Sequence, residues 1–179
     1  MKCIIINHNT RFKKELASLF SEFDTQIMNY EEFDETKLAK ADFIVLSGGP
    51  IHISDKNDLI EEKNFLKKTT KPILGICLGH QILSLVFGSK LEQFKEKKIE
   101  FFELELFGMK GQMFYSHIHY IKELPKEFRL LSKRNGFIEA MEHKTKPIFS
   151  LQGHPERSGE FGEGIKTLFI QRFVNTSKK

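Results

Sequence analysis

Short stretches rich in hydrophobic residues recur in the first half of the chain, at 3–6, 26–30, 42–46 and 72–76, and the first of them is apolar throughout. Continuous apolar runs of this length are typical of strands that are buried on both faces. Between these runs the hydrophobic residues recur every three or four positions instead, as Phe12, Leu16 and Leu19 do, which favours amphipathic helices. The first half therefore alternates strand and helix.

Polar residues mark the expected starts of these helices. Thr10 precedes the first helical segment, which extends to Phe23, while Asp34 and Ser54 precede the next two, and all three residue types are good N-caps. The segment 82–87 is apolar on nearly every side, so we expect a buried helix there. Alternating strands and helices predict a parallel sheet with helices on both faces.

The second half of the chain has a different pattern, because most of its apolar runs follow one another without a helical segment between them. Strands are expected at 99–107, 112–117, 128–131, 137–141 and 147–151, with a last helix from 161 to 173. Successive short strands favour an antiparallel extension. The sequence thus predicts a single α/β domain over 1–179, a three-layer α/β/α (flavodoxin-like) fold with a mostly parallel central sheet and a small antiparallel part.

Charge and cysteine content exclude several classes of protein. The net charge of +4 comes from 28 basic and 24 acidic residues that are mixed along the chain, so no basic surface for nucleic acid is expected. The N-terminus lacks a long apolar leader, and no apolar stretch approaches the length of a membrane span. With only Cys3 and Cys77, a disulfide framework is excluded, and we expect a cytoplasmic protein with reduced thiols.

Three polar or glycine-containing segments follow the predicted parallel strands: Asn7, the stretch 47–49 and Cys77. Ligands of parallel sheets bind beyond the carboxyl ends of the strands, so these segments are expected to meet at one edge. Cys3 lies inside a strand and is expected in the core.

Cys77 is the first candidate for chemistry because it lies between Gly75 and Gly79, at the junction of a strand and a helix. The pattern G-x-nucleophile-x-G is that of a sharp turn that holds a nucleophile in a strained conformation, with glycines where larger residues would clash. At the start of a helix, free N–H groups and the helix dipole favour a thiolate. A buried structural cysteine is the alternative interpretation.

His154 and Glu156 are the candidates for a general base and the group that orients it. They follow the strand at 147–151 and are separated by Pro155, which stiffens the link. A catalytic imidazole needs an acceptor on its far nitrogen, and Glu156 is close enough in sequence to supply one. The order Cys, His, Glu differs from the nucleophile, acid, base order of α/β-hydrolases.

Gly49 and Leu78 are the candidates for an oxyanion hole. Gly49 belongs to the glycine pair after the third strand, where backbone N–H groups can face a substrate without a nearby Cβ. Leu78 follows the nucleophile directly. One donor of this kind typically contributes about 3 to 4 kcal/mol to catalysis.

Taken together, these stretches resemble the class I glutamine amidotransferases. The similarity covers nearly the whole chain and is carried by GICLGHQ at 75–81, LSGGP at 46–50 and GHPE at 153–156. The stretch YSHIHYIKELP at 115–125 is similar to a segment of the glutaminase part of GMP synthase.

The resemblance implies hydrolysis of the glutamine side-chain amide through a thioester on Cys77, without a metal or a cofactor. It places Gln81 and the backbone near Ser116 and His117 against the bound glutamine, and it leaves His80 in a structural role. The ammonia is then delivered to a separate ATP-dependent synthetase, with GMP synthase as the leading candidate.

Two alternatives remain at this point. The same nucleophile could hydrolyse γ-glutamyl amides or peptides without a synthetase. The fold could also serve as a regulatory or binding module without turnover, although the presence of Cys77, His154 and Glu156 argues against this.

Overall fold

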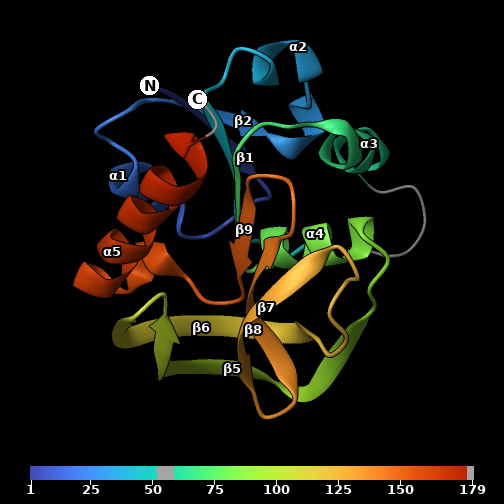
Figure 1. The fold of residues 1–179 in the computed structure, drawn as a ribbon, viewed down its shortest axis with the longest axis vertical. Helices are drawn as coiled ribbons and strands as arrows, with labels where there is room; N and C mark the ends of the chain where they lie inside the picture. Colours follow the sequence, from blue (N-terminus) through green and yellow to red (C-terminus); the bar gives the residue numbers. More distant parts are fainter. Residues whose placement is uncertain (52–58, 177–179) are drawn as a thin grey trace.

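A mixed sheet forms the middle layer of the protein (Figure 1). In residues 1–51 and 59–176, which the computed structural model describes, seven strands lie in the order β2-β1-β3-β4-β9-β8-β7. Neighbours among the first five strands are parallel, and β8 and β7 extend the sheet antiparallel. The strands are β1 (Lys2–Asn7), β2 (Asp24–Asn29), β3 (Phe43–Leu46), β4 (Ile73–Ile76), β7 (Phe128–Arg134), β8 (Phe137–His143) and β9 (Ile148–Leu151).

Helices cover both faces of this sheet, as the pattern of apolar residues predicts. The helices are α1 (Lys13–Leu19), α2 (Glu35–Leu38), α3 (Ile60–Lys68), α4 (Leu78–Val86) and α5 (Gly159–Phe169), which continues into a π-helical turn at Ile170–Val174. The buried residues of α1 and α5 pack into one hydrophobic cluster, and those of α2, α3 and α4 pack into a second on the other face. The three-layer arrangement is therefore confirmed.

Two long strands, β5 (Leu91–Leu106) and β6 (Met109–Ile121), pair antiparallel and form a ribbon beyond the carboxyl ends of β1, β3, β4 and β9 (Figure 1). The expected antiparallel part is confirmed, but it begins earlier than predicted. Residues 91–98 read LEQFKEKK and are mostly exposed, so no hydrophobic alternation identified them as a strand.

The predicted helix starts had mixed outcomes. The Asp34 side chain accepts hydrogen bonds from the N–H groups of Thr36 and Lys37 and caps α2 as expected. Thr10 does not cap α1, which begins two residues later than that prediction requires. Its hydroxyl instead accepts from the N–H of Phe12, at 3.2 Å, in the turn before the helix. Ser54 lies outside the described residues.

The strand order places the loops after β1 and β3 at the point where the order reverses, which is where open α/β sheets bind ligands. Within the described residues, no helix has the length and apolar character that a membrane span requires.

Candidate active site

Cys77 occupies the sharp turn between β4 and α4. Its backbone has φ +51° and ψ −98°, a conformation that residues with a side chain rarely adopt. The N–H of Cys77 donates to the Leu151 carbonyl of β9 at 2.9 Å, and its carbonyl accepts from the N–H of Gln81 at 3.1 Å. The turn is thus held from both sides, with the thiol at the N-terminus of a helix.

The two glycines around Cys77 are required by packing. A Cβ on Gly75 would lie 2.7 Å from Leu83 Cδ1, and a Cβ on Gly79 would lie 2.5 Å from the Leu46 carbonyl oxygen of β3. Neither glycine has a positive φ, whereas Cys77 does. The expectation that glycines prevent a clash at this turn is therefore confirmed, and the strained conformation belongs to the cysteine itself.

His154 and Glu156 form a buried pair after β9. Their side chains are 4% and 0% exposed, and His154 Nδ1 lies 2.8 Å from Glu156 Oε1. The backbone of His154 is fixed as well, because its N–H donates to the Phe114 carbonyl of β6 at 2.8 Å. The ring of Phe12 contacts the imidazole edge-on, with centroids 5.1 Å apart. The imidazole is therefore held in one orientation.

The imidazole of His154 and the thiol of Cys77 are neighbours in space, although the two residues are 77 positions apart in the sequence. A Cβ on Gly48 would lie 2.9 Å from His154 Cε1 and 3.4 Å from Cys77 Cβ, so only a glycine fits between them. His154 Nε2 is buried, and the side chain of Cys77 is its polar neighbour. The glycine loop after β3, Cys77 and His154 therefore lie together.

The charges around His154 favour its protonated form. Burial lowers the pKa of His154, but the negative charge of Cys77, its hydrogen bond to the ring and the Glu156 carboxylate outweigh burial and raise the pKa to about 10. At neutral pH this arrangement favours the imidazolium form of His154, and a cation beside the sulfur is typical of reactive cysteines.

Gly49 and Leu78 lie beside the thiol. Leu78 is the first residue of α4, and an N–H at that position has no acceptor within its own helix. Gly49 packs so closely on the loop after β1 that a Cβ there would lie 1.8 Å from the His8 carbonyl oxygen. His8 is itself fixed: its N–H donates to Ser47 Oγ at 2.8 Å, and its buried ring lies 3.1 Å from both carboxylate oxygens of Glu62.

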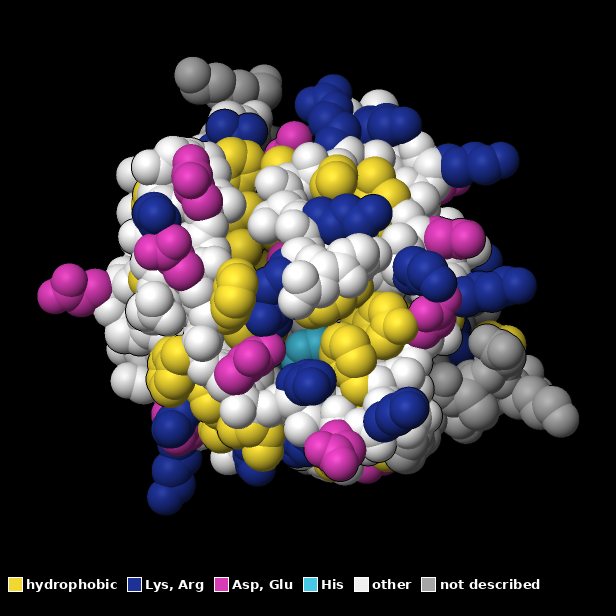
Figure 2. All heavy atoms as spheres, turned by 90° about the horizontal axis from the view of Figure 1, so that it is seen from below, with side chains coloured by type: hydrophobic (Ala, Val, Ile, Leu, Met, Phe, Trp, Pro, Cys, Tyr) yellow, Lys and Arg dark blue, Asp and Glu magenta, His cyan; other side chains and the backbone are white. Residues whose placement is uncertain are grey.

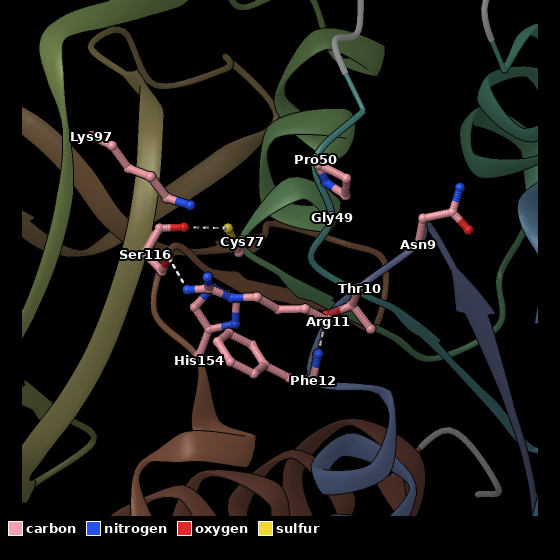
Figure 3. A pocket seen from close by; sticks show the side chains of 10 residues that line it. All are labelled: Asn9, Thr10, Arg11, Phe12, Gly49, Pro50, Cys77, Lys97, Ser116 and His154. Carbon is pink, nitrogen blue, oxygen red and sulfur yellow. Dashed lines mark hydrogen bonds between the residues drawn. The ribbon is translucent and has the colours of Figure 1, made fainter.

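Two adjoining cavities open at Cys77. The smaller, of about 120 Å³, is lined by Arg11, Phe12 and His154 (Figure 3). The larger, of about 220 Å³, is lined by Leu78, Gln81 and the β6 residues 116–119. Gly49, Pro50, Cys77, Lys97 and Ser116 border both cavities.

The three predicted substrate contacts all reach the larger cavity. The Gln81 amide donates to the His119 carbonyl at 3.0 Å and to Gln152 Oε1 at 3.1 Å, so its position is fixed by the protein. His117 Nδ1 lies 2.8 Å from the His119 carbonyl, while Nε2 is buried without a partner in the described part of the chain. Burial lowers the pKa of His117 to about 4, so the ring is neutral at physiological pH. Ser116 directs its carbonyl toward Cys77 Sγ, at 4.0 Å.

Two residues lie away from these cavities, as expected. His80 is fully buried, with Nδ1 2.9 Å from Ser150 Oγ, and burial lowers its pKa to about 3. Cys3 is fully buried in β1, and burial raises the pKa of its thiol to about 12.

Arg11 and Lys97 border the site and were not predicted from the sequence. Arg11 comes from the loop after β1, and Lys97 comes from β5, with its ammonium group directed toward Cys77 and Ser116 (Figure 3). Each is one of many basic residues in a chain with mixed charge, and neither belongs to a recognisable motif. In the described residues, no group of three or more His, Cys, Asp or Glu side chains is arranged to hold a metal ion.

Comparison with known proteins agrees with this geometry. The class-I glutamine amidotransferase family matches residues 4–172. The glutamine-hydrolysing GMP synthase subunit of Methanosarcina barkeri is 32% identical, over 96% of both chains, and that of Pyrococcus furiosus is 31% identical, over 73% of this chain and 74% of the relative. A crystal structure from Thermoplasma acidophilum, of a protein assigned to the same GMP synthase subunit, has a TM-score of 0.87 at 24% identity and covers 99% of this chain and 96% of that one.

Proposed function

The chain belongs to the class-I glutamine amidotransferase family, and on that basis we propose that it is the glutamine-hydrolysing subunit of a two-subunit, ATP-dependent synthetase of the GMP synthase type. Membership of the family supports glutamine hydrolysis. The names of the relatives from Methanosarcina barkeri and Pyrococcus furiosus support the GMP synthase type and a separate synthetase partner.

Cys77 is the proposed nucleophile. Its thiolate attacks the side-chain carboxamide carbon of glutamine, and a C–S bond forms. The C–N bond then breaks as the His154 imidazolium gives its proton to the leaving nitrogen, which departs as ammonia. Water, deprotonated by the now neutral His154, cleaves the thioester to release glutamate. Glu156 holds the tautomer of His154 through its 2.8 Å contact with Nδ1.

The N–H groups of Gly49 and Leu78 are the proposed donors that stabilise the negative charge developing on the carboxamide oxygen. Both residues border the larger cavity next to Cys77. These donors are part of the backbone, so they are in place before the reaction and need no reorganisation during it.

The amino-acid end of glutamine is assigned to the larger cavity, against Gln81, Ser116 and His117. Since His117 is neutral and its Nδ1 donates to the His119 carbonyl, Nε2 is left as an acceptor. The His117 ring itself packs against Phe94, Tyr115 and Phe137, so the α-ammonium group is assigned to the backbone near Ser116 and His117 at the wall of the larger cavity. Ser116 and the backbone around it bind the α-carboxylate and make the remaining polar contacts with the substrate.

The observation that carries the proposal is the strained Cys77 turn beside the buried His154–Glu156 pair. The test measures ammonia and glutamate release from glutamine by the purified chain, alone and with the ATP-pyrophosphatase subunit of GMP synthase from the same organism. We expect the synthetase to stimulate release, and a diazo-oxo-norleucine adduct to form on Cys77. The variant Cys77→Ala should lose both. Glutamine turnover that no synthetase stimulates would contradict the proposed subunit role.

The docking site for the synthetase is proposed on β5, next to the mouth of the cavities. Figure 2 shows this side of the molecule, where hydrophobic side chains gather among lysines and arginines. Ile99 and Phe101 are 60% and 59% exposed and share one face of the strand, close in sequence to Lys97 at the cavities. The Phe101 ring contacts Phe114, with centroids 5.2 Å apart, and Phe114 in turn packs near His154.

Exposed apolar side chains of this size, continuous with the site, favour an interface. The synthetase is the partner that the chemistry requires there, because ammonia released into water is protonated and lost. Ile99→Asp should therefore reduce stimulation by the synthetase at least tenfold while leaving diazo-oxo-norleucine labelling of Cys77 intact. The matched control is Ile27→Asp on β2 at the far edge of the sheet, where the side chain is 37% exposed. If both variants lost stimulation by the synthetase equally, β5 would not be part of the interface.

A further inference from the structure

Cys77 stands where the two cavities meet, and the cavities differ in what lines them. His154 lies on the wall of the smaller cavity, together with Arg11 and Phe12, and is not among the described residues that line the larger one. Leu78 and Gln81 belong to the larger cavity. A substrate carbon bound to Cys77 Sγ therefore has the smaller cavity on one side and the larger cavity on the other.

The chemistry decides which part of the substrate each compartment takes, and this step rests on the proposed function. A general acid must come within about 2.6 to 3.2 Å of the atom that it protonates. His154 protonates the leaving nitrogen, so that nitrogen must point into the smaller cavity. The glutamyl part then extends into the larger cavity, toward His117. The smaller cavity is thus the leaving-group compartment.

Arg11 forms the outer wall of this compartment. Its side chain runs from the loop after β1 across the opening to β6, where Nη2 donates to Ser116 Oγ at 2.9 Å (Figure 3). Along the way the guanidinium stacks on the Phe12 ring, 4.7 Å from its centroid. The guanidinium of Arg11 is therefore held by two contacts, a hydrogen bond to β6 and a cation–π contact with the adjacent Phe12 ring.

We propose that Arg11 is a specificity-determining residue that limits the leaving group to ammonia. The bonds made and broken are the same for glutamine and for an N-substituted γ-glutamyl amide: C–S forms, C–N breaks, and the proton of His154 goes to the departing amine. Chemistry alone does not distinguish them. The difference is space, because a substituent on the nitrogen would point from Cys77 toward the Arg11 guanidinium and would have to break its bond to Ser116.

The test compares kcat/KM for glutamine and for γ-glutamylmethylamide, a neutral substrate with one additional methyl group on the leaving nitrogen. In Arg11→Ala, the ratio of methylamide to glutamine turnover should rise at least tenfold over that of the unaltered protein. The matched control is Arg157→Ala. Arg157 stacks on the same Phe12 ring, 5.1 Å from its centroid, but is not among the described residues that line the smaller cavity, so the ratio should not change.

The outcomes separate this inference from the proposed function. An unchanged ratio in Arg11→Ala, with glutamine still hydrolysed, overturns the inference alone. Absence of glutamine turnover in the unaltered protein, with and without the synthetase, overturns both. A third substrate, γ-glutamylglycine, has a leaving group that carries a carboxylate. If the unaltered protein prefers it and Arg11→Ala loses that preference, Arg11 binds an anionic leaving group, and the size limit proposed here is wrong.

Discussion

Replacing Gly49 with alanine tests whether the glycine loop after β3 supplies an oxyanion donor. The added Cβ would lie 1.8 Å from the His8 carbonyl oxygen, whereas ordinary contact begins at 3.4 Å, a shortfall of about 1.6 Å. His8 has little freedom to move, because its N–H donates to Ser47 Oγ at 2.8 Å and its ring is buried against Glu62. The glycine loop must therefore shift.

A shift of this size is enough to remove the hydrogen bond from Gly49 to the oxyanion. Oxyanion donors act at 2.7 to 3.1 Å, and loss of one typically costs about 3 to 4 kcal/mol, or a factor of about 10² to 10³ in kcat. We therefore expect kcat of Gly49→Ala to fall by two to three orders of magnitude, while KM changes much less because the larger cavity keeps its contacts with glutamine.

The assay is continuous measurement of ammonia release, with circular dichroism and thermal unfolding to establish that the variant folds. Gly88→Ala serves as the control: its Cβ meets no other atom within 4 Å, but its φ of +85° strains any side chain, so stability falls without an effect on the site. If Gly49→Ala retains kcat within threefold of the unaltered protein, Gly49 does not hold the oxyanion, and the assignment must be abandoned.

Two further predictions concern the proposed catalytic groups. Because Cys77 has a φ of +51°, a glycine at this position relieves backbone strain, and Cys77→Gly should unfold at a higher temperature than Cys77→Ala. The expected difference is roughly 2 to 4 °C, which corresponds to about 1 kcal/mol, and both variants should be inactive. Equal melting temperatures would mean that the turn stores no strain. Since the pKa of His154 is raised to about 10, kcat/KM should fall as the pH rises through that value and the imidazolium is lost. Glu156→Gln removes one of the causes of the raised pKa of His154, so the fall in kcat/KM should begin at lower pH. A pH profile identical to that of the unaltered protein would mean that Glu156 does not raise this pKa.

The local geometry of the proposed nucleophile and its proposed partners could be predicted from the sequence because short local patterns encode it. A cysteine between two glycines at the end of an apolar run specifies its own turn, and the structure adds the neighbours that make the glycines necessary. His154 and Glu156 are two residues apart, so their pairing is a local property as well. The parallel part of the sheet followed from the alternation of strands and helices and from the handedness of crossovers.

Contacts between distant exposed residues could not be predicted in the same way. The bond from Arg11 to Ser116 joins residues 105 positions apart, and its formation depends on how the β5–β6 ribbon lies over the loop after β1. The ribbon itself was only partly predicted, because its first eight residues are largely charged and exposed. Similarly, the burial of Glu62 of α3 against His8 contradicts the usual exposure of charged helix residues and is visible only in the fold.

The backbone explains why three separate loops can act as one site. The N–H of Gly79, in the first turn of α4, donates to the Ser47 carbonyl of the glycine loop at 3.1 Å, and the N–H of Cys77 donates to the Leu151 carbonyl of β9. From the end of β9, the chain reaches His154 within three residues, and the N–H of His154 then bonds to Phe114 of the ribbon. Each loop is therefore tied to a neighbouring element by main-chain hydrogen bonds, which depend on the strand order and not on a bound partner. It follows that the synthetase need not assemble the proposed catalytic groups, and that its influence is expected at the mouth of the cavities, where the side chains of β5 and Arg11 lie.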